Sequence, residues 1–186
     1  MNKMDCMTDI ETLSTRPNAV ILVIAAVKFN RTGTISELKE MDTFYKRVKI
    51  DSCTVRGMHT DEATRGWWNK QDPEIRAEAF GDSQESPRED ISVVLRQFIE
   101  WFGESDVFWS HCATFDIVIM NEAFRLCGLE APWKFWNCRD TRTLYDVAGL
   151  RNNDLPQVAK HHALHDCHRQ IWGVKMSMKR LGLTNW

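Results

Sequence analysis

Two carboxylates near the start of the chain have the spacing of a metal-binding pair. Asp9 and Glu11 stand at the end of a short strand that we expect over residues 4–9. Strand side chains repeat every two residues, so both carboxylates point to one face, with Cα atoms about 6.5–7 Å apart. Two flexible carboxylates at this separation can converge on one cation. Acid pairs at strand ends are also commonly just solvated, so the pair alone is weak support for a metal site.

Two further acids and a histidine stand near expected helix starts. Asp116 lies in the first turn of a helix that we expect to open at Thr114. Asp166 begins the last expected helix, and His161 precedes it by five positions. Each acid has a simpler explanation, because acids are stabilised at helix N-termini. The ordered combination of these segments with the strand-end pair is more specific than any one of them.

In this order the motifs resemble the DEDDh 3′–5′ exonucleases, which include polymerase proofreading subunits, ribonuclease T and oligoribonuclease. The resemblance is closest to a phage and bacterial branch of exoribonucleases and, in prophages, exodeoxyribonucleases, and it covers roughly residues 7–175. The blocks that carry it are Asp9-Ile10-Glu11-Thr12-Leu13, Pro17-Asn18-Ala19, Trp67-Trp68, Ala113-Thr114-Phe115-Asp116, Phe135-Trp136-Asn137, Arg139-Asp140, Arg142-Thr143 and His161-x-Ala163-Leu164-x-Asp166.

Two departures from this branch stand beside the predicted site. His111 and Cys112 occupy a loop where the branch usually has small Asn and Gly residues, so they could narrow the loop. His165 stands where an acid is common beside the metal-binding aspartate. Neither departure removes one of the five residues that the resemblance makes catalytic.

The resemblance implies hydrolysis of single-stranded RNA or DNA from a free 3′ end, releasing nucleoside 5′-monophosphates. Two cations about 3.5–4 Å apart can stabilise the attacking and leaving oxygens, and carboxylate ligands suit Mg²⁺ or Mn²⁺. By resemblance, Asp9 bridges both ions, while Glu11 and Asp166 complete the site of the attacking water. Asp116 supports the second ion. His161 would take the proton from the water, because its reference pKa of about 6.5 lies near working pH.

Substrate contacts are expected around the acidic pair and on nearby aromatic and basic residues. The residues predicted to bind substrate are Thr12, Leu13, Trp68, Phe115 and Arg139. Leu13 could wedge against a base or simply pack. Trp67 and Trp68 could stack on bases, although paired tryptophans are more often part of the core. Arg139 and Arg142 are expected to reach phosphates.

The elements that position these residues form an α/β pattern, with strands first and then alternating helices and strands. We expect strands over 4–9, 19–30, 41–50, 106–110 and 135–138. We expect helices capped by Thr60, by Asp72-Pro73 and by a capping box at Ser86-Pro87-Arg88-Glu89, and further helices from Thr114 and over 141–150 and 163–181. This order predicts an α/β layer with helices on both faces of a mixed sheet. A five-stranded RNase H-like sheet is one such arrangement, and it is the fold that the resemblance implies.

The bulk properties agree with one soluble domain over residues 1–186. Apolar residues make up 43% and charged residues 27%, with a net charge of −2 that gives no overall basic character. The longest apolar run, 19–27, is too short to span a bilayer, and no signal peptide pattern is present. We therefore expect no membrane partner and a cytoplasmic location, in the host if the protein is viral. The six cysteines lack a C-x-x-C pair, which indicates free thiols.

Three alternatives stay open. Histidines at 161, 162, 165 and 168 could form a zinc site, but the glutamate of H-E-x-x-H is missing. The chain could be a catalytically inactive nucleic-acid-binding module, or an RNase H-type endonuclease.

The choice between RNA and DNA also stays open, because no side chain is demonstrably placed to read a 2′-hydroxyl. Relatives of this kind are often dimers, so a homodimer is expected.

Overall fold

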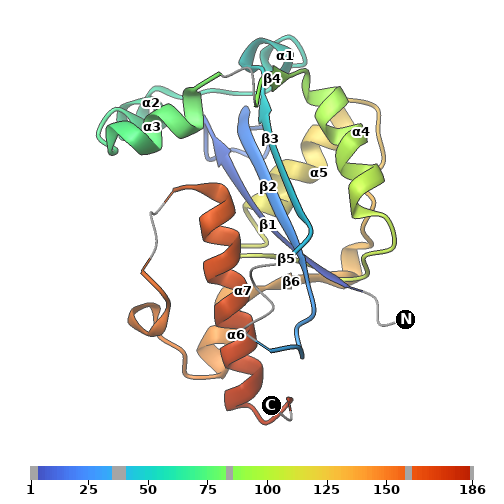
Figure 1. Ribbon diagram of the computed structural model, residues 1–186. Coiled ribbons are helices and arrows are strands. Elements are labelled where there is room, and N and C mark those ends of the chain that lie inside the picture. Colours follow the sequence, from blue (N-terminus) through green and yellow to red (C-terminus); the bar gives the residue numbers. More distant parts are fainter. Residues whose placement is uncertain (1–3, 35–40, 83–85, 158–160, 185–186) are drawn as a thin grey trace.

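The computed structural model describes residues 4–34, 41–82, 86–157 and 161–184 (Figure 1). Its centre is a six-stranded mixed sheet with the order β4-β3-β2-β1-β5-β6. The strands are β1 (Asp5–Thr12), β2 (Ile21–Phe29), β3 (Thr43–Val48), β4 (Arg88–Glu89), β5 (Phe108–Ser110) and β6 (Cys138–Asp140). β1, β2 and β3 are antiparallel neighbours, whereas β5 runs parallel to β1 and β6 runs parallel to β5.

Helices cover both faces of the sheet, as Figure 1 shows for α7 on one face and for α4 and α5 on the other. The helices are α1 (Ile50–Thr54), α2 (Glu62–Trp68), α3 (Pro73–Phe80), α4 (Ile91–Phe102), α5 (Asp116–Leu126), α6 (Thr141–Val147) and α7 (Ala163–Arg180). Short 3₁₀ turns occur at Phe135–Asn137 and Asn152–Asp154. This α/β architecture confirms the predicted fold class.

The core is built around β2, whose side chains are almost all buried. Its apolar and β-branched run Ile21–Phe29 is the pattern of a strand with helices on both faces. On the α4 side, Phe98 meets the rings of Phe108 and Phe124 edge to face at centroid distances of 6.2 and 6.5 Å. Aromatic side chains bury large apolar areas and dominate core energetics. The result is a rigid central sheet that fixes the backbone of β1.

The sheet has six strands rather than the predicted five, because Arg88 and Glu89 form a strand beside β3. The predicted capping box at 86–89 is therefore wrong. The Arg88 guanidinium donates hydrogen bonds to the Val48 carbonyl at 2.8 Å and to the Leu22 carbonyl at 3.1 Å, which stabilises this extended segment. Helix α4 begins only at Ile91.

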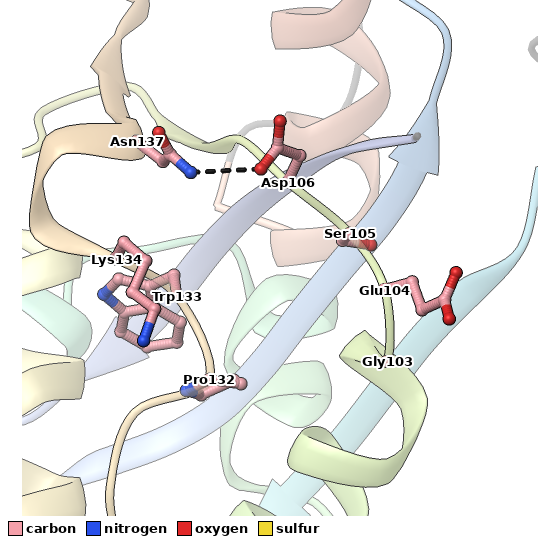
Figure 2. A pocket seen from close by; sticks show the side chains of 8 residues that line it. All are labelled: Gly103, Glu104, Ser105, Asp106, Pro132, Trp133, Lys134 and Asn137. Atoms are coloured by element: carbon pink, nitrogen blue, oxygen red, sulfur yellow. Dashed lines mark hydrogen bonds between the residues drawn. The ribbon is translucent and has the colours of Figure 1, made fainter. Parts of the chain in front are cut away.

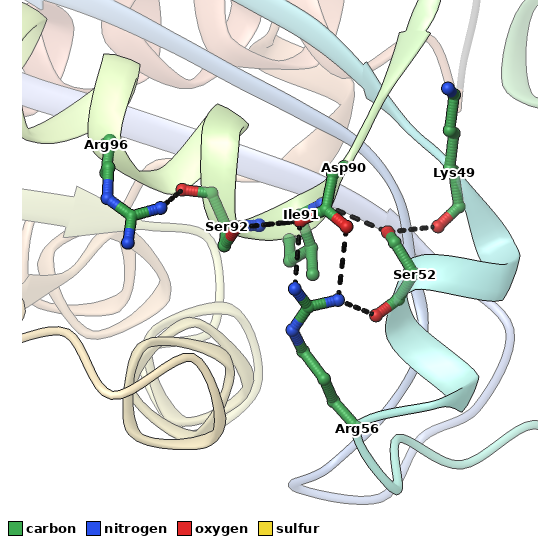
Figure 3. Close-up of polar contacts among 7 residues, drawn as sticks. All are labelled: Lys49, Ser52, Arg56, Asp90, Ile91, Ser92 and Arg96. Carbon is green, nitrogen blue, oxygen red and sulfur yellow. Dashed lines mark hydrogen bonds and ion pairs between the residues drawn. The ribbon is translucent and has the colours of Figure 1, made fainter.

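Asp90 provides the N-cap of α4 in place of the predicted box. Its Oδ1 accepts from the Ser92 amide at 2.8 Å, and its carboxylate pairs with the Arg56 guanidinium (Figure 3). The Ser52 hydroxyl accepts from the Ile91 amide at 3.0 Å, so α1 also contributes to this helix start. A charged cap at the helix N-terminus interacts favourably with the helix dipole.

Other predicted boundaries shift by a few residues. α2 is capped by Asp61, whose carboxylate accepts from the Thr64 amide at 2.6 Å, and not by Thr60. α5 begins at Asp116 rather than at Thr114, and 135–137 is a 3₁₀ turn that leads into β6. The predicted start at Asp72-Pro73 is confirmed, since Asp72 caps α3.

Two general expectations can be compared with the structure. All six cysteines are free, as predicted from their spacing. No helix in the described parts of the chain combines the length and apolar character needed to cross a membrane.

Candidate active site

Three carboxylates converge where β1 extends beyond its neighbour. β5 pairs with β1 only at Cys6 and Met7, so Asp9 and Glu11 lie past the end of β5. Asp166 reaches the same point from the first turn of α7. One carboxylate oxygen from each of these three acids lies within 4.8 Å of the others, and this is the only such group of possible metal ligands in the described residues. Convergent carboxylate oxygens suit a hard divalent cation.

Asp116 joins this cluster from the start of α5. Its Oδ1 accepts a hydrogen bond from the amide of Ile10, between Asp9 and Glu11, at 3.4 Å. The Asp116 side chain is buried, and its own amide bonds to the Cys112 carbonyl at 3.2 Å. The structure therefore brings together all four acids that the sequence motifs indicated.

The pKa values of the four acids show the electrostatic strain of this arrangement. Burial raises the pKa of Asp9 and Glu11 well above the ordinary values, and repulsion from the neighbouring carboxylates raises both further. Burial likewise raises the pKa of Asp116 to about 7 and raises that of Asp166. Bound cations would compensate this concentrated negative charge, so the residues present fit a divalent metal site.

His161 is held beside the cluster by an unusual backbone conformation. Its φ of 62° is the one positive value for a non-glycine residue in the part of the chain that the structure describes. Left-handed backbone is unfavourable for residues with a side chain. The conformation lets the His161 amide donate to Asp166 Oδ2 at 2.9 Å, which ties the predicted base to a predicted metal ligand.

The structure revises which tryptophan borders the site. Trp68 is 2% exposed, and its indole N–H donates to the Thr12 carbonyl at 2.9 Å, so core packing explains it. Trp67 is 40% exposed, and its ring meets the His161 ring edge to face at 4.8 Å. α2 is too short for hydrophobic periodicity to distinguish the two neighbours. Burial therefore favours the core alternative for Trp68, and Trp67 is the tryptophan that stands exposed beside His161.

The other predicted substrate residues near the acids differ in how far their side chains are buried. Leu13 is 0% exposed, which favours the packing alternative for its side chain. Thr12 is also buried, and its hydroxyl donates to the Ser14 carbonyl at 2.8 Å. Phe115 is half-buried and directly precedes Asp116 at the start of α5.

Arg139 does not turn toward the four acids. Its guanidinium donates to the carbonyls of Trp136 and Cys138 at 2.8 and 2.9 Å. The charges that act on the cluster come instead from Arg142, which lowers the pKa of Asp116 against the larger effect of burial, and from Arg169, which does the same for Asp166. Arg142 belongs to a motif block and was expected near phosphates, whereas Arg169 was not anticipated.

Gln170 is a second residue that sequence reasoning missed. Its Nε2 donates to Asp9 Oδ1 at 2.8 Å. The signal was present, because Gln170 follows Asp166 by four residues and therefore lies on the same face of α7.

The histidines of α7 do not support the zinc alternative. The rings of His162 and His165 stack nearly parallel, with centroids 3.8 Å apart. Within the described ranges, however, no three histidine, cysteine or acidic ligands that include them come close enough to share an ion.

Two pockets lie away from the acids. One, of about 340 Å³, opens at the starts of β5 and β6, where Asn137 Nδ2 donates to Asp106 Oδ1 at 3.1 Å (Figure 2). Another, of about 580 Å³, lies beside α1 and β4. No predicted site residue lines either pocket, so the carboxylate cluster defines the candidate site.

A mixed sheet whose central strand carries two acids, with two more acids from the first turns of α5 and α7, has the layout of an RNase H-like fold with a candidate divalent-metal site. Residues 4–178 match the family described as the 3′-5′ exoribonuclease Rv2179c-like domain, and the chain belongs to this family. The predicted resemblance to DEDDh 3′–5′ exonucleases is thus confirmed, and the protein is a hydrolytic enzyme of that class.

Individual relatives agree with this assignment. The exodeoxyribonuclease of Enterobacteria phage T4 is 23% identical over 207 residues, covering 94% of this chain and 89% of the relative. The nuclease domain of 3′hExo, a DEDDh family member crystallised with rAMP, has a TM-score of 0.56 at 15% identity and covers 97% of this chain and 93% of its own. Cell-death related nuclease 4 has a TM-score of 0.55 at 14% identity, with 97% of this chain covered. The present chain spans 64% of that nuclease's length.

Proposed function

We propose that this exonuclease removes nucleotides one at a time from the free 3′ end of single-stranded RNA or DNA. The products would be nucleoside 5′-monophosphates, and two divalent cations, Mg²⁺ or Mn²⁺, would be required. The observation that carries the proposal is the convergence of Asp9, Glu11 and Asp166 within 4.8 Å, with Asp116 bonded to the strand between the first two. Carboxylate sites that hold two cations recur in enzymes that cleave phosphodiesters.

Each acid has a distinct place in this proposal. Asp9 lies centrally, because Asp116, Glu11 and Asp166 all act on its charge, so Asp9 would contact both cations. Glu11 and Asp166 would hold one cation and Asp116 would support the other. When bound, the cations would activate water and stabilise charge on the attacking and leaving oxygens. His161, tied to Asp166 through its amide, would accept the proton from the attacking water.

Trp67 supports the preference for an unpaired strand. Its half-exposed indole beside His161 offers a surface for a nucleotide base, and such stacking is worth about 1–3 kcal/mol per base. Stacking needs a base that is free of its complementary strand. Arg142 and Arg169, whose charges act on the site, would attract the phosphates.

Digestion of matched oligonucleotides tests the proposal. RNA and DNA strands of one sequence, labelled at the 5′ end, would be incubated with the protein and Mg²⁺ or Mn²⁺, with EDTA as the metal-free control. We expect a ladder with one-nucleotide steps, lost in EDTA and in Asp9→Asn but kept in Glu104→Gln, a change of an acid that lines the remote pocket of Figure 2. The ratio of the RNA and DNA rates would assign the preferred substrate.

Two outcomes would contradict the proposal. Binding without cleavage under all metal conditions would indicate an inactive nucleic-acid-binding module. Internal cuts in an RNA–DNA hybrid, without shortening from the 3′ end, would indicate an endonuclease.

A further inference from the structure

Gln170 places a neutral amide directly against the central acid of the cluster. Its Nε2 lies 2.8 Å from Asp9 Oδ1, and the side chain is 4% exposed. An amide cannot lose or gain a proton at ordinary pH, so this donor is always available to the carboxylate. The bond occupies one oxygen of Asp9 and restricts rotation of the carboxylate. The same carboxylate lies beside those of Glu11 and Asp166, with one oxygen of each acid within 4.8 Å of the others.

The side-chain amide oxygen of Gln170 bears on why a glutamine, and not an apolar residue, occupies this position. Its Oε1 is buried and has no hydrogen-bond partner among the described residues. A buried acceptor without a partner is unfavourable, and this loss offsets much of what the bond to Asp9 contributes to stability. An apolar residue would fill the same position without that loss, as Ile171 and Val174 do on the same helix. A buried polar group that adds little stability points to a role in the site.

Tyr145 fixes Gln170 in turn. The Tyr145 hydroxyl, on α6, donates to the Gln170 carbonyl at 2.7 Å. The two helices approach closely here, because a Cβ added at Gly173 would overlap the Tyr145 hydroxyl. α6 therefore determines the position of α7 at the turn that follows Asp166, and both Asp166 and Gln170 reach Asp9 from that helix.

We propose that Gln170 is a positioning residue that orients the Asp9 carboxylate for cation binding. The inference rests on the proposed function, because it assigns Asp9 to the cations. In this role Gln170 acts through the Asp9 carboxylate. Its loss weakens cation binding and slows turnover, while the affinity for the oligonucleotide stays the same.

The test compares Gln170→Met with a control that the chain itself provides. Gln97 has the same features at a remote place: its Nε2 donates to Glu89 Oε2 at 2.9 Å, and its Oε1 is also buried without a partner. Methionine matches glutamine in length and removes both polar atoms in each variant. Mn²⁺ binding by calorimetry without substrate, thermal unfolding, kcat and KM would be measured for wild type, Gln170→Met and Gln97→Met.

We expect Gln170→Met to bind Mn²⁺ about 10–100-fold more weakly and to lose a similar factor in kcat, as for partners of metal ligands elsewhere. Its KM for the oligonucleotide and its melting temperature should stay close to wild type, and Gln97→Met should change neither Mn²⁺ binding nor kcat. Tyr145→Phe, which keeps the ring and removes the bond to Gln170, should show the same effects in weaker form.

Wild-type Mn²⁺ affinity and kcat in Gln170→Met would overturn the inference while leaving the proposed function intact. An unfolded Gln170→Met would also overturn it, because the side chain would then be a structural requirement. A wild-type protein that neither binds Mn²⁺ nor degrades nucleic acid would refute both.

Discussion

Replacement of Asp116 by asparagine would measure the cost of burying its charge in the acid cluster of the metal-free protein. Asparagine has nearly the same shape and retains an Oδ1 that can accept from the Ile10 amide. The change removes one negative charge and little else. We expect Asp116→Asn to unfold at a higher temperature than wild type when no metal is present, and to lose nuclease activity.

The size of this effect follows from the raised pKa of Asp116. Burial moves that pKa from 3.8 to about 7, and each pKa unit corresponds to about 1.4 kcal/mol, so an isolated group would destabilise the fold by about 4 kcal/mol when ionised. Because the carboxylates of the cluster titrate together, we expect about 2 kcal/mol in practice. For a domain of this size that is a shift of about 4–8 °C in melting temperature.

The sign of the pH dependence is fixed by the same pKa. The folded state holds the Asp116 proton more tightly than the unfolded state does. The contribution of the Asp116 carboxyl to the stability of the wild-type fold is therefore fully present below pH 3.8, and it is lost as the pH rises toward about 7. The advantage of Asp116→Asn should vanish near pH 3.5 and reach its full size above pH 7.

Thermal and urea unfolding in EDTA, followed by circular dichroism from pH 3.5 to 8.5, would check this expectation. Asp146→Asn, a change of an exposed acid on α6, serves as the matched control. Added Mn²⁺ should stabilise wild type more than Asp116→Asn, because only wild type keeps the full ligand set. A variant that is less stable than wild type at pH 8 without metal, or an advantage that does not change with pH, would refute the electrostatic reasoning.

Three further changes have specific expected outcomes. His161→Gln should lower kcat by about 10²–10⁴-fold while Mn²⁺ binding by calorimetry stays near wild type, and a rate that persists would exclude His161 as the base. Trp67→Leu should raise KM for single strands more than it lowers kcat, whereas Trp136→Leu, at an exposed remote tryptophan, should change neither. Gly173→Ala should reduce the free energy of unfolding in urea by about 1–3 kcal/mol, because its methyl group meets the Tyr145 ring; unchanged stability would show that the helices can separate.

The local geometry of the site was predictable from the sequence wherever strand or helix periodicity alone sets the direction of a side chain. The two-residue spacing of Asp9 and Glu11 places both side chains on one face of β1, and Asp166 does lie in the first turn of its helix. Their convergence with Asp116 was not predictable from spacing, because it depends on where β5 ends and how α5 and α7 pack. The ordered resemblance to a known family supplied that long-range information.

The wrong predictions concern segments too short to show a period. Two residues, Arg88 and Glu89, form β4, and a two-residue strand has no alternation to detect. The choice between Trp67 and Trp68 depends on how a seven-residue helix is rotated against the sheet. Gln170 was overlooked because a polar residue inside a helix is ordinarily assigned to its solvent face.

The bond from the Trp68 indole to the Thr12 carbonyl links helix α2 to strand β1 beside the acids. It fastens α2 to the residue next to Glu11, so the neighbouring Trp67 lies at a fixed separation from the acids. On the proposed function, that separation would set the distance between the base stacked on Trp67 and the phosphodiester bond that is cut. Shortening by one nucleotide would then follow from a fixed length in the protein, whatever the base sequence of the strand.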